Sequence, residues 1–469
     1  MKRRTKIVCT LGPAVDSKEA IARLIDAGMN VARINCSHGD WPTRQKWIGW
    51  VRELSPDIGP VGVLVDLHGP KFRIGEVKGG QIELKPDVPV TLGPGKGADI
   101  PVTQPEMAAA LGTGCRVLLG DGEVELKIGR KSGQLFEARP LCGGTVKSHQ
   151  GMTLVGKVFK TPAMTKEDKA DAVEACKAGA DFIALSYVHT GEDLIGLRRL
   201  VDKHDPAVRL CAKIETGQAL KNLDEILAHC NMAMVARGDL GLQIDLEEVP
   251  IAQKRIIRRC NDLGKPVITA TQMLESMIHA PRPTRAEVAD IANAILDGTD
   301  AVMLSAETAM GEYPAEAVRT MVRVANETEP IFDHAAAMQR FSVRKTAGID
   351  PTEAIANAVV SLADHTRPAA ILTTTTSGQT ACLVSKFRPP TPILCATWKP
   401  KTLTQMSAVW GVEAVLTPKP ESTDENVAHA IDGFVRHKRI KVGDTVLITA
   451  GVPAGKPGNT NLILNQVVK

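Results

Sequence analysis

Aromatic residues are scarce in this chain of 469 residues, making up 3% of the composition. So few rings leave little surface on which bases could stack, and the net charge of +4 is small and spread along the chain, so nucleic-acid binding is not expected. No apolar run approaches the ~18 residues of a membrane-spanning helix. The ten cysteines form no C-x-x-C pair, which is typical of reduced thiols rather than of a zinc site.

The first residues also lack a targeting signal. The stretch MKRRTKIVCTLGPA has a basic start, but Gly12 and Pro13 end its apolar run after a few residues, which is too short for a secretory signal peptide. Together with the reduced cysteines, this predicts a cytoplasmic protein that neither enters a membrane nor binds nucleic acid. Small anionic ligands are compatible with the slight positive charge.

The chain does contain a repeating pattern of a strand followed by a helix. Eight short runs are rich in β-branched residues, and most are followed by stretches such as KEAIARLIDAG, in which apolar residues recur at helical spacing and a glycine marks the end. Eight such units are the number in a closed parallel (β/α)₈ barrel, a TIM barrel. An open doubly wound sheet is the alternative, but no G-x-G-x-x-G follows any strand. The runs cover residues 5–10, 30–35, 61–66, 181–187, 209–215, 232–237, 266–271 and 301–305.

Two segments do not fit the barrel pattern. Residues 72–156 are rich in glycine and proline and contain short alternating runs typical of hairpins, which predicts a small β domain inserted after the third strand. After about residue 336, further strands alternate with helices, which predicts a separate α/β domain. We therefore expect a barrel of residues 1–71 and 157–335, an inserted β domain of residues 72–156 and a carboxy-terminal α/β domain of residues 336–469.

Polar residues collect where the predicted barrel strands end. In a parallel barrel, these carboxyl ends and the loops after them build the active site. Each residue alone has a structural explanation, such as a helix cap for Asp239 or a first-turn carboxylate for Glu307. Arg33 and Lys213 are different, because a cation in a strand that is covered on both faces needs a partner. The residues at this rim are Asn35, Ser37, Asp66, Lys213, Glu215, Arg237, Gly238, Asp239, Thr271, Ser305 and Glu307.

The charges at this rim favour phosphoryl transfer. Lys213 and Glu215 are two positions apart in a strand, so their side chains point the same way. Glu215 and Asp239 follow neighbouring strands and would hold a hard divalent cation such as Mg²⁺. Lys213, Arg33 and Arg73 would surround a phosphoryl group with positive charge, and the backbone N–H groups after the sixth strand would bind a carboxylate or phosphate.

Five stretches are distinctive: TKIVCTLGPA, ARINCSHG, CAKIETGQAL, VARGDLG and the long TATQMLESMIHAPRPTRAEVADIANAILDGTDAVMLSAETAMGEYPAEAV. With them the chain resembles the pyruvate kinase family along nearly its whole length. The resemblance implies a (β/α)₈ barrel, an inserted small β-barrel lid, a carboxy-terminal α/β regulatory domain and a homotetramer. It also implies the transfer, dependent on Mg²⁺ or Mn²⁺, of the phosphoryl group of phosphoenolpyruvate to ADP, giving pyruvate and ATP in the last step of glycolysis.

The resemblance also implies roles for individual residues. Lys213 would stabilise the transferring phosphoryl group, and Glu215 and Asp239 would bind Mg²⁺. Thr271 would bind the substrate and help to protonate the enolate, and Gly238 would contact the substrate carboxylate through its backbone. The positions that match phosphate-binding residues are Arg33 for the substrate and Asn35, Ser37, His38 and Arg73 for the nucleotide.

The segment after the third strand departs from the family pattern. Many members read D-T-K-G-P-E there and hold a K⁺ with residues equivalent to Asn35, Ser37 and Asp66. This chain reads DLHGPK, so Leu67 replaces a threonine and Lys71 replaces a glutamate. A fixed ammonium group near the place of the cation would substitute for it. We expect catalysis without K⁺; the alternative is that Lys71 points into solvent and the K⁺ site survives.

Two other segments depart from the pattern. In the lid, Gln150 stands where a lysine is usual, and Lys147 and Lys157 are the candidates to replace that lysine. After the fourth strand, His189 stands where an arginine is common.

The third domain contains TTTTSGQTA between a strand and a helix. Hydroxyl and N–H groups at such a turn would form a nest for a phosphate, and the resemblance implies an allosteric phosphate site there. An ordinary helix cap is the alternative. Lys399, Lys401 and the loop 451–461 would complete an effector site. Its candidate residues are Thr373, Thr374, Thr375, Thr376, Ser377 and Gly378.

Two other functions compete with this interpretation. A Mg²⁺-dependent barrel lyase or mutase that forms an enolate from a phosphorylated or keto acid could share the two carboxylates and an arginine, but it would not need a lid or ADP. A non-catalytic regulatory protein should lack Lys213, Glu215, Asp239 or Thr271, and all four are present.

Overall fold

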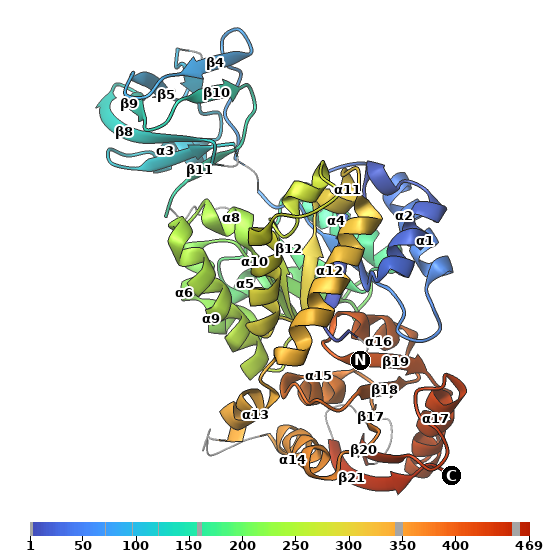
Figure 1. Ribbon diagram of the computed structural model, residues 1–469. Coiled ribbons are helices and arrows are strands. Elements are labelled where there is room, and N and C mark those ends of the chain that lie inside the picture. The colour runs from blue at the N-terminus through green and yellow to red at the C-terminus, as the bar shows by residue number, and fades with distance from the viewer. Residues whose placement is uncertain are drawn as a thin grey trace.

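The chain folds into three bodies arranged in a row (Figure 1). The computed structural model describes residues 3–70, 72–95, 97–120, 122–156, 162–342, 350–452 and 460–469. A β domain, called the lid from here on, lies at one end of the row. A β/α barrel lies in the middle and an α/β domain at the other end.

The middle body is a closed barrel of eight parallel strands, which confirms the expected fold class. Each of the eight predicted runs forms one strand. Neighbouring strands pair in the order β1-β16-β15-β14-β13-β12-β3-β2. The strands are β1 (Lys6–Thr10), β2 (Val31–Asn35), β3 (Gly62–Asp66), β12 (Phe182–Leu185), β13 (Arg209–Ile214), β14 (Met232–Ala236), β15 (Val267–Ala270) and β16 (Ala301–Leu304).

Helices surround the barrel, and the sequence explains where they begin and end. The helix α1 begins after Ser17, whose side chain accepts a hydrogen bond from the backbone of Ala20, and ends at Gly28, which has a φ of 123°. Capping boxes at Thr165 and Thr284 begin α4 and α10. The helices are α1 (Lys18–Ala27), α2 (Trp41–Leu54), α4 (Lys166–Lys177), α5 (Gly191–Val201), α6 (Gly217–Lys221), α7 (Leu223–Ala228), α8 (Arg237–Gly241), α9 (Val249–Asp262), α10 (Arg285–Leu296), α11 (Ala306–Ala309) and α12 (Pro314–Thr328).

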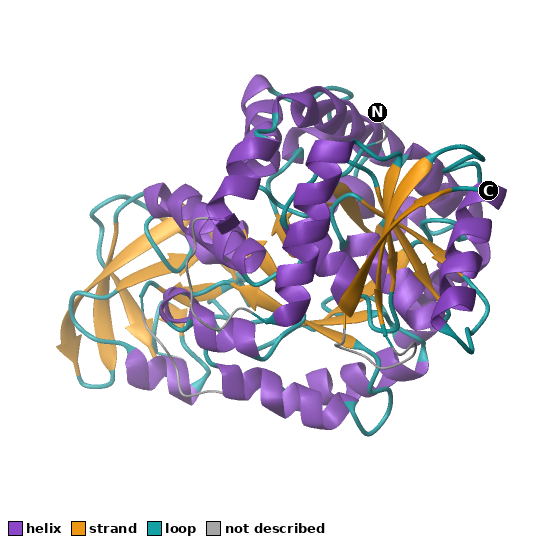
Figure 2. Ribbon diagram, turned by 90° about the horizontal axis from the view of Figure 1, so that it is seen from below, coloured by secondary structure: helices purple, strands orange, loops and turns teal. Residues whose placement is uncertain are grey.

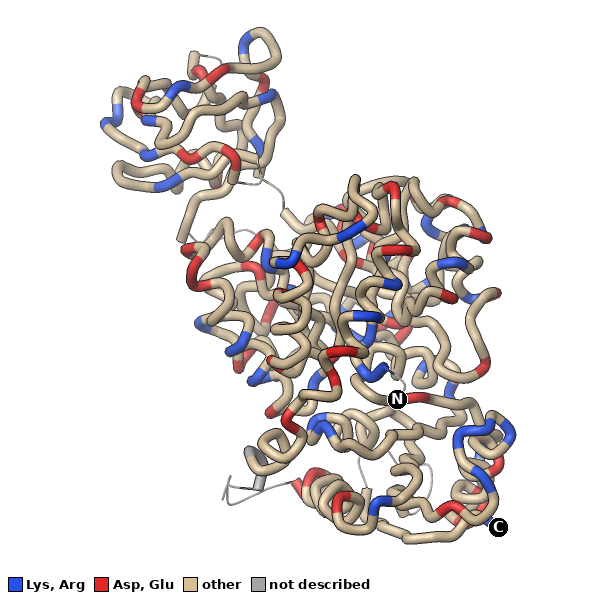
Figure 3. Tube along the Cα trace, viewed as in Figure 1, with Lys and Arg blue, Asp and Glu red and all other residues tan. Residues whose placement is uncertain are grey.

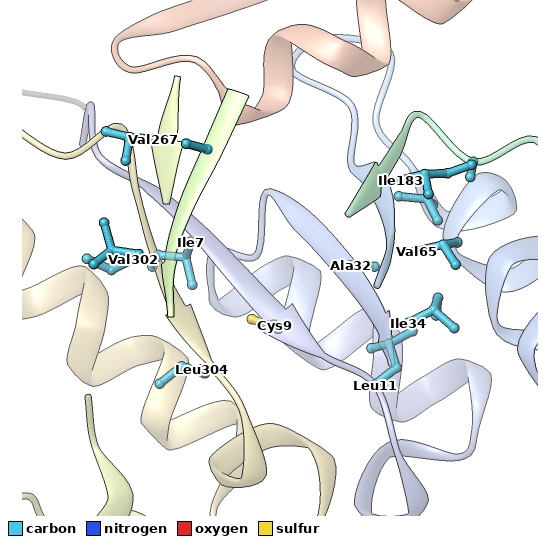
Figure 4. Packing of buried hydrophobic residues seen from close by; sticks show 14 of the residues in the cluster. Ile7, Cys9, Leu11, Ala32, Ile34, Val65, Ile183, Val267, Val302 and Leu304 are labelled. Carbon is cyan, nitrogen blue, oxygen red and sulfur yellow. The ribbon is translucent and has the colours of Figure 1, made fainter. Parts of the chain in front are cut away.

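Side chains of the barrel strands alternate between two apolar cores. Ile7 and Cys9 of β1 face outwards and join residues of β2, β3, β12, β15 and β16 in the larger core between strands and helices (Figure 4). Val8 faces inwards and joins Leu64 and Met234 in a core inside the barrel. This inner core forms an apolar floor beneath the carboxyl ends of the strands.

The lid is built from short strands, as its alternating sequence predicts. A six-stranded sheet in the order β11-β7-β8-β9-β5-β6 and a two-stranded ribbon of β10 and β4 enclose one apolar core. The helix α3 (Pro105–Ala110) was not expected from a segment that reads as hairpins. The strands are β4 (Gln81–Leu84), β5 (Val90–Gly93), β6 (Ile100–Pro101), β7 (Arg116–Leu119), β8 (Val124–Ser132), β9 (Leu135–Pro140), β10 (Gly144–Lys147) and β11 (Met152–Leu154).

The third body is a five-stranded sheet in the order β19-β18-β17-β20-β21. Its first four strands are parallel, and β21 pairs antiparallel with β20. The strands fan out beside the carboxy terminus in Figure 2. The strands are β17 (Ala370–Thr374), β18 (Ile393–Thr397), β19 (Val412–Leu416), β20 (Thr445–Gly451) and β21 (Thr460–Val467). The helices of this part are α13 (His334–Ser342), α14 (Pro351–Thr366), α15 (Gln379–Lys386), α16 (Pro400–Gln405) and α17 (Thr423–Arg436).

Charges of both signs are interspersed along the chain in all three bodies (Figure 3). Within the described residues, no helix is long and apolar enough to cross a membrane.

Candidate active site

The strand β13 carries the lysine of the proposed site. Cys211 of this strand faces the core inside the barrel, so Lys213, two residues later, points to the same side. Glu215 follows with the same alternation, just beyond the end of the strand. The Nζ atom of Lys213 lies 2.7 Å from Oε1 of Glu215, and both side chains are almost fully buried. The pair therefore faces the barrel axis above the apolar floor.

Two further groups hold the Lys213 ammonium in place. Its Nζ atom donates a 2.7 Å hydrogen bond to Oγ of Ser186, which follows β12. The Ser186 hydroxyl in turn donates to the carbonyl oxygen of Leu67 at 2.8 Å. Asp66 at the end of β3 lies 3.4 Å from the same ammonium through Oδ1. The ammonium is thus oriented by groups from three neighbouring strands.

Arg33 belongs to the same cluster. From β2, its guanidinium donates to Oδ2 of Asp66 through Nε at 2.8 Å and lies 2.7 Å from that oxygen through Nη2. A third bond, 2.9 Å long, joins Nη1 to the hydroxyl of Thr10 at the end of β1. Arg33, a cation in a strand covered on both faces, therefore has its partners at the rim, in Asp66 and Thr10.

Electrostatics fixes the charges of this cluster. Burial alone would lower the pKa of Lys213, but the carboxylates of Asp66, Glu215 and Asp239 raise it above its ordinary value. Burial would raise the pKa of Asp66, yet Lys213 and Arg33 hold it below its ordinary value. For Glu215, burial outweighs the attraction of Lys213, and the nearby charge of Asp239 raises the pKa further. Burial thus disfavours the negative charge of Glu215 more than Lys213 favours it.

The carboxylates at this rim were expected to hold a divalent cation. Among the described residues, Oδ1 of Asp66 and Oε1 of Glu215 are buried and have only the Lys213 ammonium close by, at 3.4 and 2.7 Å, while Oε2 of Glu215 accepts a 2.8 Å hydrogen bond from the backbone of Tyr187. No group of three or more His, Cys, Asp or Glu side chains suited to a metal occurs in the described part of the chain. Mg²⁺ commonly takes only one or two carboxylates and completes its shell with water and substrate oxygens. Glu215 and Asp239, the two carboxylates expected to hold the ion, are near enough for the charge of Asp239 to raise the pKa of Glu215.

Gly238 and Thr271 meet at the next part of the rim. The backbone N–H of Gly238, in the short helix α8, donates a 2.8 Å hydrogen bond to the hydroxyl of Thr271, which itself donates to the carbonyl of Ala270 at 2.6 Å. Thr271 has a φ of 69°, a conformation that costs a β-branched residue free energy. The guanidinium of Arg237 donates a 2.6 Å hydrogen bond to the carbonyl oxygen of Thr271. The same guanidinium forms an ion pair with Asp290, and these two contacts hold Thr271 in place.

A cleft of about 390 Å³ separates the lid from this rim. Arg73 and Gln150 of the lid line it, together with Tyr187 and Asp239 of the barrel. Lys147 is not among its lining residues, and Lys157 lies outside the described residues.

The other residues expected at the nucleotide are Asn35, which ends β2, and Ser37 and His38 in the turn after it. Oδ1 of Asn35 accepts a 3.1 Å bond from the backbone of Ser37, and the backbone of His38 bonds to the carbonyl of Asn35. Asn35 is paired in register with Asp66 of β3, which joins this turn to the lysine cluster.

The segment DLHGPK lies at the same rim. The side chain of Leu67 is buried in the outer core rather than facing the cluster. Both oxygens of Asp66 lie against the cations of Arg33 and Lys213. Lys71, which was expected to replace K⁺, lies outside the described residues.

The expected effector residues lie in the third body, away from this rim. Thr373 and Thr374 are buried in β17, and the hydroxyl of Thr374 accepts a 3.0 Å bond from Asn426. The turn that follows is stabilised by a hydrogen bond of its own, because the hydroxyl of Thr375 accepts the backbone N–H of Gly378 at 2.9 Å.

His189, which stands where an arginine is common, is half-buried beside Thr216, and burial lowers the pKa of its imidazole.

Sequence reasoning missed three members of the site. Thr10, Ser186 and Tyr187 orient Arg33, Lys213 and Glu215, respectively, as described above. Thr10 ends β1, and the other two follow β12. The rule that located the site, a polar residue at the carboxyl end of a barrel strand, would have found Thr10 and Ser186 had it been applied to the first and fourth strands.

Two family models match the chain. The model for "Pyruvate kinase, barrel domain" matches residues 2–318, and the model for "Pyruvate kinase, alpha/beta domain" matches residues 353–464.

Relatives that carry the name "Pyruvate kinase" are similar over the whole chain. The protein from Geobacillus stearothermophilus is 43% identical over 476 residues, covering 100% of this chain and 81% of the relative. The protein from Sporosarcina psychrophila is 40% identical, covering 99% of this chain and 80% of the relative. "Pyruvate kinase 2" from Synechocystis sp. is 41% identical, covering 100% of this chain and 80% of the relative. The chain belongs to the pyruvate kinase family.

Proposed function

We propose that the barrel rim around Lys213 is where this phosphotransferase moves the phosphoryl group of phosphoenolpyruvate to ADP. The observation that carries the proposal is the buried Lys213 ammonium, 2.7 Å from Glu215 and close to Asp66. A fixed cation in a site that excludes water stabilises charge on a transferring phosphoryl group far more than it would in bulk solvent.

The reaction assigns a role to each group. The bond between phosphorus and the enol oxygen breaks, and a bond forms to a terminal oxygen of ADP. Lys213 and Arg33 would stabilise the charge on the phosphoryl oxygens during this transfer. The enolate that remains takes a proton at its methylene carbon, with Thr271 guiding that proton, and becomes pyruvate. The N–H of Gly238 would bind the substrate carboxylate once Thr271 releases it.

The metal requirement follows from the same cluster. The family depends on Mg²⁺, and the two acidic side chains Glu215 and Asp239 at this rim, whose charges act on each other, support them as its protein ligands. When bound, the ion neutralises negative charge on the phosphoryl oxygens. We propose that K⁺ is not required, because Asp66 already lies against two fixed cations and Leu67 supplies no side-chain oxygen.

The enolate-forming lyase or mutase has no support from the comparisons, which match pyruvate kinases in both the barrel and the α/β domain.

The proposed reaction implies ADP, ATP and pyruvate as ligands. The division at residues 71/72, 156/157 and 335/336, the homotetramer and the cytoplasmic location stay predictions.

A coupled assay with phosphoenolpyruvate, ADP and Mg²⁺ tests the proposal. Replacing Lys213→Met should lower kcat by a factor of about 10³ or more, because the cation acts mainly on the transition state. The control Lys169→Met changes an exposed lysine of α4 and should keep activity within about twofold. A folded Lys213→Met variant, judged by its thermal transition, with nearly full activity would refute the proposed site.

A further inference from the structure

Arg44 is a buried cation that the proposed reaction does not use. It belongs to α2, the helix that follows β2, and the residue is 5% exposed. A guanidinium stays charged at every pH at which proteins are folded, so its burial costs free energy unless acceptor oxygens surround it. The acceptors around Arg44 therefore indicate what the side chain does.

Most of these acceptors are backbone carbonyls of one short turn, residues 36–39. Nη2 of Arg44 donates to the carbonyl oxygens of Cys36 at 2.8 Å, His38 at 3.0 Å and Gly39 at 3.0 Å. Nε donates a longer bond, of 3.3 Å, to the carbonyl of His38. Carbonyl oxygens that converge repel one another, and the planar guanidinium offsets that repulsion with its charge and its several donors. The conformation of the turn therefore depends on Arg44.

The same turn contains two residues expected at the nucleotide phosphates, Ser37 and His38. Its first residue is fastened to the lysine cluster, because the backbone N–H of Cys36 donates a 2.9 Å bond to the carbonyl of Asp66. Its last two residues are held through their carbonyls by Arg44. The turn thus lies between the proposed catalytic cluster at one end and the Arg44 guanidinium at the other.

Two side chains hold the guanidinium itself. Oδ1 of Asp171, in α4, lies 3.5 Å from Nη1 of Arg44, and the same oxygen accepts a 2.7 Å bond from the indole N–H of Trp41. Cζ of Arg44 lies 5.3 Å from the centre of the Trp41 ring, which adds a cation–π contact. Arg44 is therefore fixed by groups from two helices, α2 and α4, before any nucleotide arrives.

We propose that Arg44 is a positioning residue that holds the turn of residues 36–39 in the conformation that binds the phosphate groups of ADP. The inference rests on the proposed function, because the nucleotide role of the turn does. Arg44 acts through the backbone that carries Ser37 and His38, and the Lys213 cluster keeps its own contacts without it. Loss of Arg44 should therefore weaken ADP binding and leave the transfer step nearly unchanged.

Arg52 provides a matched control, because it makes the same kinds of contact at the other end of the barrel. It also belongs to α2, donates to the carbonyls of Val61 at 3.2 Å and Gly179 at 2.8 Å, and pairs with Asp181 at 2.8 Å. These partners precede β3 and β12, at the amino ends of the strands. Arg52→Met therefore removes a carbonyl-binding cation from the same helix without changing the nucleotide turn.

Calorimetry with ADP and Mg²⁺ on the full chain measures the Kd, and the coupled assay measures KM and kcat, both well below the thermal transition of each variant. Arg44→Met should raise the Kd and the KM for ADP by about tenfold or more. Its kcat should stay within about threefold and its KM for phosphoenolpyruvate within about twofold. Arg52→Met should leave the Kd for ADP within about twofold. Equal losses of ADP affinity in the two variants would overturn the proposal.

Arg44→Lys separates the geometry of the guanidinium from its charge, and it tests the proposal even if Arg44→Met does not fold. An ammonium group keeps the positive charge, but it lacks the planar fork that binds several carbonyls of the turn at once. We therefore expect Arg44→Lys to raise the Kd for ADP by about fivefold or more. If this variant binds ADP as tightly as the unmodified chain, charge alone is sufficient and the positioning role is wrong.

The unmodified chain separates this inference from the proposed function. Absence of kinase activity in the unmodified chain would contradict the proposed function together with the role of Arg44 that rests on it. An active chain whose ADP affinity is the same in Arg44→Met would contradict the role of Arg44 alone. A fall in kcat with an unchanged KM for ADP would also overturn the inference, because the effect would then be on the transfer step.

Discussion

At the residue scale, the candidate site is a group of charges that compensate one another. Lys213 is buried between Glu215, Asp66 and Ser186, and Arg33 is held by Asp66 and Thr10. Such buried ions are costly unless they are paired and hydrogen-bonded. The arrangement fixes the positive charges of Lys213 and Arg33 beside the carboxylates of Asp66 and Glu215 at one rim of the barrel.

Ser186 is a positioning residue whose role can be tested. Replacing Ser186→Ala removes a 2.7 Å hydrogen bond to the Lys213 ammonium. Hydrogen bonds to charged groups contribute roughly 1.5–3 kcal/mol, so we expect kcat to fall by about ten- to a hundredfold. Because Ser186 orients the lysine rather than binding ADP, KM for ADP should change little. Steady-state kinetics check this split, and an unchanged kcat in the variant would contradict the role.

The monovalent-cation requirement is a second test at this scale. Activity in KCl and in tetramethylammonium chloride should agree within about twofold, because we expect Lys71 to supply the positive charge that K⁺ would otherwise provide. The matched variant Lys71→Glu should lose activity in tetramethylammonium chloride by about tenfold or more and recover it in KCl. Strong stimulation of the unmodified chain by KCl would show that it needs the cation.

At the element scale, the start of α10 fastens the loop that follows β15. The side chain of Glu287 accepts bonds from the backbone and hydroxyl of Thr284, and it also accepts bonds from the backbone and hydroxyl of Ser276 at 2.7 and 2.6 Å. Ser276 follows Thr271 by five residues in the same loop. The Glu287 carboxylate therefore connects the cap of α10 to the loop that contains Thr271, the residue proposed to assist protonation of the enolate. The capping box therefore stabilises both helix and loop.

This carboxylate predicts a pH dependence of stability. Partial burial alone would raise the pKa of Glu287, but its bonds from Ser276 and Thr284 hold it below the ordinary value. A lowered pKa in the folded state means a stabilising contribution that is present above the unfolded pKa, about 4.3, and is lost as the pH falls through the folded pKa. Glu287→Ala should therefore lower the free energy of unfolding by about 1–2 kcal/mol near neutral pH and by less in acid.

Urea titrations at several pH values measure this difference. The control is Glu275→Ala, which removes an exposed carboxylate from the neighbouring 3₁₀ turn (Glu275–Ile278). Its effect on the free energy of unfolding should stay within about 0.5 kcal/mol. A Glu287→Ala effect that stayed the same or grew in acid would contradict the predicted sign.

At the scale of the whole molecule, a buried ion pair joins the barrel to the third body. Arg388 contacts both carboxylate oxygens of Asp300 at 3.0 Å and donates to the side chain of Asn261 at 3.0 Å. Its guanidinium also lies 4.9 Å from the centre of the Trp410 ring. Asp300 accepts the backbone N–H groups of Val267 and Trp410 as well, so it links β15 to the other body directly.

Breaking this pair should destabilise the chain strongly. Arg388→Met leaves Asp300 buried without its cation, which typically costs about 3–5 kcal/mol. The double variant Arg388→Met with Asp300→Asn removes the uncompensated charge and should recover part of that loss. Urea unfolding followed by tryptophan fluorescence measures both variants. A double variant less stable than Arg388→Met would show that the uncompensated charge of Asp300 is not the main cause of the lost stability.

The amino-acid sequence by itself determined much of this protein. Its strand runs, with polar residues at their carboxyl ends, predicted the barrel and its rim, because strand periodicity and buried charge are local properties of a sequence. It did not reveal α3, whose six residues are too short for a clear helical period. It also missed β21, which only its pairing with β20 makes a strand.

Only the tertiary structure decided which residues of distant strands touch. That Ser186 and Asp66 meet Lys213, and that Arg209 reaches Ser377 of another body, depends on strand order and domain docking. Contacts between residues far apart in sequence form because folding buries apolar surface over the whole chain, and no short segment encodes that burial.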